Sequence, residues 1–384
     1  MPVSAYADEP AAAKGPPPAP DPAATAAWLE KAYAGKDPPE AVRMLVAIAR
    51  GSQMGPGDGW FGPCQTRYTW DWLARACGAD PAQGVPKGKF AGKPEWFDRL
   101  DRNKDGTVRA DDLDWSDASP YVQMAGVVSR FFRRFDGSGD GKLTKAEWDA
   151  FFQRAAGGKD HLSGDDLRDA LLAGFGGGGG FRPGDGPDPA VLVRGLFAGE
   201  IGSLHEGPKV GQPAPDFTLT THDGKQSVRL SEVLGRGKPV VLVFGNFTCG
   251  PFRALYPGVE DVYHRFKDDA AFLGVYVREA HPTDGWAMMS NTMAGVTVKQ
   301  PTTYAERAAV AGKFCAKLSP SFPFLVDGIT DPVGNAYSGM PARLYVIDRD
   351  GKVAYKGGRG PFGFKAGEME QALVMALLGD RDSD

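Results

Sequence analysis

Cys249 is the residue of this chain whose position is best suited to chemistry. It follows the apolar, β-branched run 239–248, which predicts a buried parallel strand, and it stands where that strand turns into a helix. The unpaired N–H groups and positive dipole end of a helix N-terminus favour thiolate over thiol, so we expect a pKa below about 7.5 for Cys249. Thiolate is the nucleophilic form of cysteine, and the position therefore predicts thiol chemistry.

A single cysteine stands at this turn. The sequence Cys249-Gly250-Pro251-Phe252 resembles the redox corner of the thioredoxin fold, with Phe252 in place of the second cysteine of a Cys-x-x-Cys pair. Any disulfide must therefore be closed by an outside thiol or by a cysteine from elsewhere in the chain. Cys315 is a candidate resolving thiol, and a buried, inert cysteine is the alternative for that position.

A second polar group follows the strand predicted at 271–277, which contains Tyr276. Parallel neighbouring strands bring their carboxyl ends to one edge of a sheet, so we expect Glu279 and His281 to lie close to Cys249. A histidine there can donate a proton, and a carboxylate two residues away can orient it. Pro341 precedes a later strand. The resemblance to thioredoxin-like proteins implies a cis-proline at this place, packed against the active cysteine, and a trans turn proline is the alternative for Pro341.

The pattern from residue 210 onward alternates strands with helices, which predicts an α/β thioredoxin-like domain over 190–380. The predicted strands are 216–221, 227–230, 240–247, 271–277, 322–326, 343–348 and 352–356. The predicted helices are 251–267, 302–317 and 366–378.

Two twelve-residue loops, 101–112 and 136–147, carry acidic and small residues in the pattern of a pair of EF-hands. The second loop has a nearly complete set of oxygen donors for Ca²⁺: Asp136, Ser138, Asp140, the Lys142 carbonyl, Thr144 and Glu147. The first loop offers Asp101, Asn103, Asp105, Thr107 and Asp112. It is the weaker site, because Asp112 is shorter than the usual Glu and Arg109 adds positive charge. Loose Ca²⁺ binding, a preference for Mg²⁺ and no binding all remain open for it.

These features predict two domains. We expect a disordered tail at 1–24, an all-α domain at 25–173 that contains the EF-hand pair, and a Gly-rich linker at 174–189. The long linker predicts that calcium stabilises the N-terminal domain without changing the reactivity of Cys249.

The formal net charge of −4 argues against a nucleic-acid partner. No stretch approaches the roughly 18 uninterrupted apolar residues of a membrane span. Ala5-Tyr6-Ala7 has the small-x-small pattern of a signal-peptide cleavage site, which slightly favours an extracytoplasmic location over a cytoplasmic one.

The C-terminal half resembles the iodothyronine deiodinases in residues 244–252, 279–286, 344–347 and 357–361. The resemblance spans about 210–380 and places Cys249 where the animal enzymes carry selenocysteine. It implies that Tyr276, Glu279 and His281 are active-site residues and that Arg359, with Thr248 and Pro341, contacts the substrate. The chain departs from the family pattern at Phe247 and Phe322, which replace cysteines, and at Pro301, which replaces a histidine.

These observations leave three functions open. The first is a thiol-dependent oxidoreductase of deiodinase type, acting on a small molecule such as an iodinated aromatic compound. The second is a thiol peroxidase or general thioredoxin-like reductase, although Leu242 and Asn246 replace the Pro and Thr of the peroxiredoxin motif. The third is a non-catalytic calcium-binding module. We expect Ca²⁺ and an external thiol reductant such as a thioredoxin, no nucleotide cofactor, and a homodimer as one candidate assembly.

Overall fold

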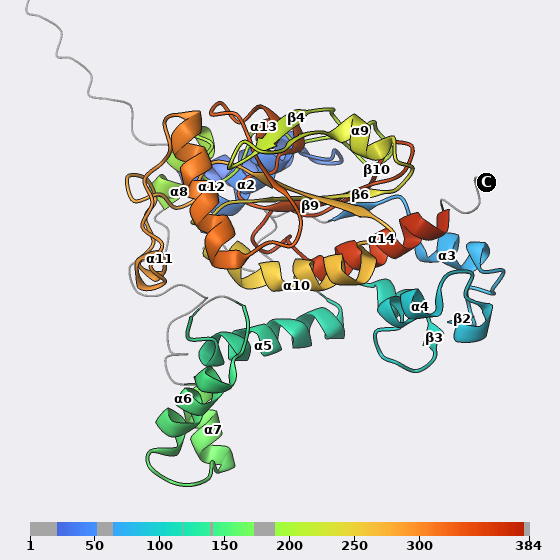
Figure 1. Ribbon diagram of the computed structural model, residues 1–384, viewed down its shortest axis with the longest axis horizontal. Coiled ribbons are helices and arrows are strands. Elements are labelled where there is room, and N and C mark those ends of the chain that lie inside the picture. Colours follow the sequence, from blue (N-terminus) through green and yellow to red (C-terminus); the bar gives the residue numbers. More distant parts are fainter. Residues whose placement is uncertain (1–20, 52–63, 117, 139–140, 173–188, 380–384) are drawn as a thin grey trace, which may run out of the picture.

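The computed structural model of the chain describes residues 21–51, 64–116, 118–138, 141–172 and 189–379 (Figure 1). Most of the predicted tail and the predicted Gly-rich linker lie outside these residues, as does Asp140. Helix α1 (Pro22–Ala32) begins inside the range predicted as tail, because Asp21 caps its first turn through a hydrogen bond from the Ala23 N–H.

The centre of the structure is one eight-stranded sheet. Its strands run in the order β1 (Gln65–Thr66), β10 (Val353–Lys356), β9 (Arg343–Ile347), β6 (Val240–Gly245), β7 (Ala271–Tyr276), β8 (Phe324–Val326), β4 (Thr218–Thr221) and β5 (Ser227–Arg229). All six residues of β6 are buried, as expected for an apolar, β-branched run in the middle of a sheet covered on both faces.

The connections around β6 are those of a thioredoxin-like fold, so the predicted fold of the C-terminal domain is confirmed. Strand β6 leads through α10 (Gly250–Phe266) to β7, which pairs with it in parallel. Strand β9 pairs antiparallel with β6 on its other side, and β10 continues into α14 (Ala366–Gly379). The parallel pairing sets Gly245 opposite Tyr276. The segments that follow these two residues therefore leave the sheet at the same edge.

Helices cover both faces of the sheet. Helices α10, α12 (Tyr304–Leu318) and α14 lie on one face, where Phe314 of α12 packs on Phe252 of α10 and α14 packs on α10 and β9. On the other face α13 (Pro332–Tyr337) places the Tyr337 ring 5.2 Å from the rings of Phe244 and Tyr345. The remaining short helices of this half are α8 (Pro189–Phe197), α9 (Leu230–Leu234) and α11 (Met289–Met293).

The expectation of an all-α N-terminal domain is not confirmed. Strand β1 pairs with β10 and so extends the C-terminal sheet, while β2 (Val85–Pro86) and β3 (Thr107–Val108) pair with each other. Helices α3 (Trp70–Ala76) and α4 (Pro94–Leu100) pack against α14 and share its hydrophobic core. Gln371 of α14 also donates a 3.0 Å hydrogen bond to the Asp112 carbonyl. The sequence pattern missed these contacts because they join segments far apart in the chain.

Helices α1 and α2 (Glu40–Ala49) form a hairpin whose second helix packs on α8. Its core is a separate apolar cluster that includes Met44, Ile48, Leu192 and Leu196. Two partly buried aromatic residues of the C-terminal half, Trp286 and Phe362, pack against this cluster.

The predicted EF-hand helices are α5 (Pro120–Phe135) and α6 (Lys145–Ala156), followed by α7 (Gly164–Leu172). In Figure 1 they extend away from the sheet, on the side of α10. The loop between α5 and α6 touches α10: a Cβ on Gly141 would lie 2.5 Å from the Ala254 carbonyl oxygen. Within the described residues, no helix is long and apolar enough to cross a membrane.

Candidate active site

Cys249 is the residue that precedes α10, and it lies at the helix N-terminus as predicted. Pro251 occupies the first turn of α10, where the missing N–H of proline costs no helical hydrogen bond. The thiol is free and its residue is 1% exposed. The position predicted from sequence is confirmed, but the thiol is enclosed rather than open to solvent.

Asn246 organises the loop around Cys249. Its side-chain oxygen accepts hydrogen bonds from the N–H groups of Cys249 (3.0 Å) and Ala280 (3.3 Å). Its amide nitrogen donates to the Pro341 carbonyl at 3.0 Å. One buried amide thus joins the loops that follow β6 and β7 to the loop before β9. Sequence reasoning weighed Asn246 only against the peroxiredoxin motif, although an amide that ends a buried apolar run signals such a role.

Thr248, Glu279 and Tyr276 form one buried hydrogen-bonded group beside Cys249. The N–H and hydroxyl of Thr248 donate to Glu279 Oε2 at 2.9 and 2.7 Å. The Tyr276 hydroxyl donates to Glu279 Oε1 and accepts the Phe247 N–H at 3.1 Å. The predicted proximity of Glu279 to the cysteine loop is therefore confirmed. Burial raises the pKa of Glu279 despite these donors, and burial followed by the nearby carboxylate raises that of Tyr276.

Arg253, one turn into α10, is a buried cation beside the thiol that sequence reasoning missed. Its guanidinium donates to the Phe247 carbonyl and, at 2.9 Å, to Asn291 Oδ1. Asn291 in turn donates to the Thr248 carbonyl at 2.7 Å. Arg253 Nε is buried and has no hydrogen-bond partner among the described residues. The positive charge of Arg253 favours the thiolate of Cys249.

The expectation of a low pKa for Cys249 is wrong for this closed structure. Burial is the largest effect and raises the pKa of the thiol to about 11. The Phe252 N–H and the charge of Arg253 act in the opposite direction, while Glu279 adds to the increase. The helix N-terminus is present as predicted, but its stabilisation of the anion is smaller than the cost of removing that anion from water.

His281 is tied to the site through its backbone and faces Trp286 with its ring. Its N–H donates to Thr248 Oγ1 at 3.0 Å. Its Nδ1 lies 3.2 Å from the Trp286 carbonyl oxygen, and the two rings are 4.5 Å apart in an edge-to-face arrangement. The carbonyl can accept from Nδ1–H, and in that tautomer Nε2 is the ring nitrogen without a proton.

Pro341 has the predicted cis peptide bond, and it is linked to Cys249 through Asn246. Cys315 is a free, partly buried cysteine of α12, and burial raises its pKa to about 11. Its neighbour Phe314 packs against Phe247, on the loop before Cys249. A resolving role for Cys315 stays a prediction.

Arg359 lies in a second buried polar group, with Glu40 of α2. Its Nη2 is 2.7 Å from Glu40 Oε2, and it also donates to the Ser203 carbonyl and to Ser338 Oγ. The guanidinium is buried against protein groups. Glu40 therefore binds the Arg359 guanidinium at the position where the family resemblance implies a substrate contact. A nearby cavity of about 340 Å³ is lined by Ser203, His205, Arg278, Asn335 and Met340, among others.

The second EF-hand loop turns its two terminal carboxylates inward. Asp136 accepts the Gly141 N–H at 2.8 Å, and Glu147 accepts the N–H groups of Ser138 and Thr144 at 2.9 and 3.0 Å. These hydrogen bonds lower the pKa of Glu147 to about 2. This carboxylate and hydroxyl donor set fits a hard cation such as Ca²⁺.

The first EF-hand loop satisfies its own carboxylates. Arg109 Nη1 lies 2.6 Å from Asp105 Oδ2, so this carboxylate is already paired with a guanidinium. Asp112 accepts the N–H groups of Arg102 and Arg109, each at 2.9 Å, and Asp101 accepts that of Gly106. In the part of the chain that the structure describes, no three or more His, Cys, Asp or Glu residues are grouped to hold a metal.

Comparisons with known proteins give matches in both halves of the chain. A family model for iodothyronine deiodinase matches residues 193–375, and one for the EF hand matches 94–113 and 128–152. The chain is 31% identical over 205 residues to thyroxine 5-deiodinase of Gallus gallus, covering 50% of this chain and 78% of that protein. It is 29% identical to the Ovis aries enzyme over 181 residues, which is 47% of this chain and 60% of that protein.

Among solved structures, a putative thiol:disulfide interchange protein DsbE from Chlorobium tepidum is similar to 44% of this chain, with 98% of its own chain covered. The sequence identity is 26% and the TM-score is 0.31. A secreted disulfide oxidoreductase of Mycobacterium tuberculosis has 16% identity, covers 41% of this chain and 95% of its own, and has a TM-score of 0.31.

Proposed function

Because the chain belongs to the iodothyronine deiodinase family of oxidoreductases, we propose that it removes halogen reductively from a small aromatic molecule through the thiolate of Cys249. The observation that carries the proposal is the set of buried hydrogen bonds that ties Thr248, next to Cys249, to Glu279 and Tyr276. Arg253 supplies the positive charge that a thiolate requires at this loop.

In the proposed step, Cys249 Sγ attacks the halogen, for example iodine. A sulfur–iodine bond forms and the carbon–iodine bond breaks, with its electron pair left on carbon. That carbon takes a proton, for which His281 is the proposed donor. Carbon is thereby reduced and the sulfur is oxidised to a sulfenyl iodide.

An external dithiol completes the proposed cycle. Its first thiolate attacks Sγ of Cys249, releases iodide and forms a mixed disulfide. Its second thiol then displaces Cys249, which returns as a free thiol while the reductant leaves as a disulfide. A dithiol reductant such as a thioredoxin would suit this exchange. In the internal alternative, Cys315 attacks Sγ of Cys249, releases iodide and forms a Cys249–Cys315 disulfide, which the external dithiol then reduces.

Deprotonation of Cys249 is the step that the closed structure opposes. A pKa of about 11 leaves very little thiolate near neutral pH. Water or substrate must therefore reach the loop before the thiol is activated, since the positive helix end and Arg253 then act without the full cost of burial.

The second EF-hand loop would hold Ca²⁺ through Asp136, Ser138, Thr144, Glu147 and the Lys142 carbonyl, with Asp140 completing the set. A bound ion there would stabilise the helix pair α5–α6, whose Phe135 and Phe151 rings pack 4.5 Å apart. We propose that the first loop is structural and binds no metal, because Arg109 already neutralises Asp105.

The test is a pair of assays with dithiothreitol, one for iodide release from 3,5-diiodotyrosine and one for consumption of hydrogen peroxide. Wild type is compared with Cys249→Ser and with Cys77→Ser, a matched loss of a buried thiol elsewhere in the core. Iodide release lost only in Cys249→Ser supports the proposal. Peroxide consumption without iodide release would favour a thiol peroxidase, and full activity of Cys249→Ser would contradict both enzymatic functions.

A further inference from the structure

Glu40 of α2 is bound by positively charged residues that all belong to the C-terminal domain. Arg343 and Arg359 place Nη2 atoms 2.8 and 2.7 Å from Glu40 Oε2, and Lys356 Nζ lies 3.9 Å from Oε1. The three cations are 0%, 1% and 4% exposed, so the carboxylate supplies the interaction that water would otherwise give them.

The C-terminal domain leaves this positive charge incompletely neutralised. Besides Glu40, the three cations donate to neutral acceptors, among them the carbonyls of Glu206, Ser203 and Met340 and the hydroxyl of Ser338. Among the described residues, the Glu206 carboxylate is the second negative group that acts on Lys356, and it accepts the Glu40 N–H at 3.0 Å. Burial, and then repulsion by Arg343, lowers the pKa of Lys356 to about 8. The group therefore has the character of an anion site.

The anion that fills this site, the Glu40 carboxylate, belongs to a segment outside residues 193–375, which the deiodinase family model matches. Glu40 is the first residue of α2, and the apolar face of that helix packs on α8 through Met44 and Ile48. The same cluster contacts Trp286, whose ring is 4.5 Å from His281. The α1–α2 hairpin thus fills the anion site through Glu40 and shares an apolar cluster with Trp286, the ring neighbour of the candidate proton donor.

A chain of contacts also joins the anion site to the thiol. Arg359 donates to the Met340 carbonyl at 3.5 Å, next to Pro341. Asn246 connects the Pro341 carbonyl to the Cys249 N–H. Cys249 is 1% exposed, so some part of the protein must move before any reagent reaches it.

We propose that the α1–α2 hairpin is an internal lid, latched by Glu40 in the anion site of Arg343, Lys356 and Arg359, and that an aromatic carboxylate opens it by displacing Glu40. This inference rests on the proposed function for the identity of the site that the lid covers. The bound carboxylate takes over the interactions of Glu40, while the hairpin swings away from Trp286 and admits water to Cys249. The apparent affinity for such a ligand is then reduced by the small fraction of open molecules.

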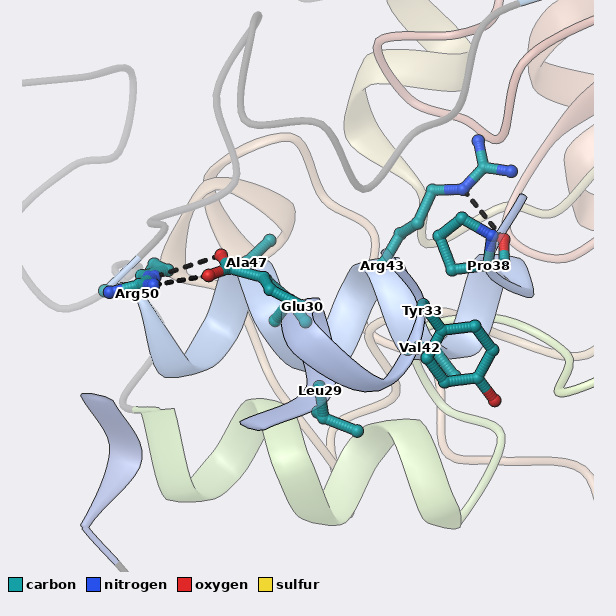
Figure 2. A pocket seen from close by; sticks show the side chains of 10 residues that line it. Leu29, Glu30, Tyr33, Pro38, Val42, Arg43, Ala47 and Arg50 are labelled. Atoms are coloured by element: carbon teal, nitrogen blue, oxygen red, sulfur yellow. Dashed lines mark hydrogen bonds and ion pairs between the residues drawn. The ribbon is translucent and has the colours of Figure 1, made fainter. Parts of the chain in front are cut away.

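The test measures how fast iodoacetamide alkylates Cys249 in the full chain at fixed pH, followed by mass spectrometry. In Glu40→Gln the latch loses its charge, and the rate should rise by about tenfold as the open fraction increases. Glu30→Gln is the matched control, because it removes the 2.6 Å ion pair with Arg50 on the same hairpin, where both side chains line the pocket shown in Figure 2. That pair is half exposed and remote from the anion site, so its rate should stay at the wild-type value.

A second arm needs no substitution. Sodium benzoate added to wild type should accelerate alkylation in a saturable manner, whereas benzamide, a neutral molecule of the same shape, should not. An unchanged rate in folded Glu40→Gln, or in wild type with benzoate, overturns the latch. Should Glu40→Gln fail to fold, which its melting curve would reveal, the benzoate arm decides alone.

The alkylation readout does not depend on turnover. Faster alkylation without any iodide release would retain the lid and remove the proposed function. Iodide release by wild type, together with unchanged alkylation in both arms, would retain the proposed function and exclude the lid.

Discussion

Thr248 Oγ1 lies 2.7 Å from Glu279 Oε2 and 3.0 Å from the His281 N–H, so one hydroxyl joins the cysteine loop to both residues after β7. The hydroxyl is fully buried, as is the carboxylate that it contacts. The residue before the thiol is thereby fixed relative to the candidate acid.

Replacing Thr248 by Val should remove both hydrogen bonds while keeping the shape of the side chain. The buried Glu279 oxygen loses a donor, which should destabilise the fold by about 1–3 kcal/mol and lower turnover more than substrate affinity. Thermal melting and kcat against KM check this. Thr302→Val is the control, because Thr302 makes a similar 2.8 Å contact with Glu306 at an exposed position. Equal effects of the two substitutions would contradict the assigned role of Thr248.

The alkylation rate of Cys249 should rise with pH to a midpoint well above 9, because the reacting thiolate forms only as pH approaches the pKa of about 11. Iodoacetamide labelling of wild type across the pH range measures the midpoint, with Cys249→Ser to identify the signal. A midpoint near 7 would show that the thiol is solvated in the resting protein.

Glu40 should make the stability of the folded protein depend on pH in the acidic range. Burial alone would raise its pKa, but Arg343 and Arg359 outweigh that effect and lower it to about 2. A depressed pKa stabilises the fold above the unfolded value of about 4.3, and this contribution is lost as pH falls toward 2. The difference in melting temperature between wild type and Glu40→Gln should therefore shrink as pH falls from 5 to 2. A difference that stays constant with pH would exclude an ionised Glu40.

His281→Ala should reduce turnover by roughly 10²–10⁴-fold, the usual contribution of a general acid, with a smaller effect on substrate binding. The control is His264→Ala, since His264 lies on α10 with a largely exposed side chain. Steady-state iodide release measures both variants. Near-wild-type turnover of His281→Ala would reduce its role to packing against Trp286.

Calcium should raise the melting temperature of the α5–α6 region in wild type and in Asp112→Asn, but not in Glu147→Gln. A ligand bound only by the folded state stabilises it by about 2.7 kcal/mol at a free concentration a hundredfold above Kd. Calorimetry in calcium and in chelator gives the comparison. Loss of the shift in Asp112→Asn would mean that the first loop binds the ion after all.

The sequence predicted the strands and long helices of the C-terminal half closely, because apolar β-branched runs and helical periodicity persist over several residues. It missed short helices such as α11 and α13, whose one or two turns give no periodic signal. It located Cys249, Thr248, Glu279 and Tyr276, since the order of parallel strands brings their ends together.

The sequence could not predict how burial changes the pKa of a side chain, or which residues far apart in the chain contact one another. The pKa of Cys249 depends on enclosure by the whole fold, and the roles of Asn246 and Arg253 arise from tertiary contacts. The family motif indicates a substrate contact for Arg359, and nothing in that motif indicates that Glu40 binds its guanidinium. The glycine-rich linker predicts that the calcium loop and the thiol are independent. In the structure, however, Gly141 of the calcium loop lies directly against α10, the helix that follows Cys249.

Gly141 meets two requirements that come from different halves of the chain. Its φ of +81° suits the sharp turn of the loop, and its missing side chain lets that loop rest on the Ala254 carbonyl of α10. Any larger residue would have to push the loop away from the helix that begins after Cys249. The identity of residue 141 is therefore constrained by the thiol helix as well as by the calcium loop, although the two segments lie more than a hundred residues apart in the sequence.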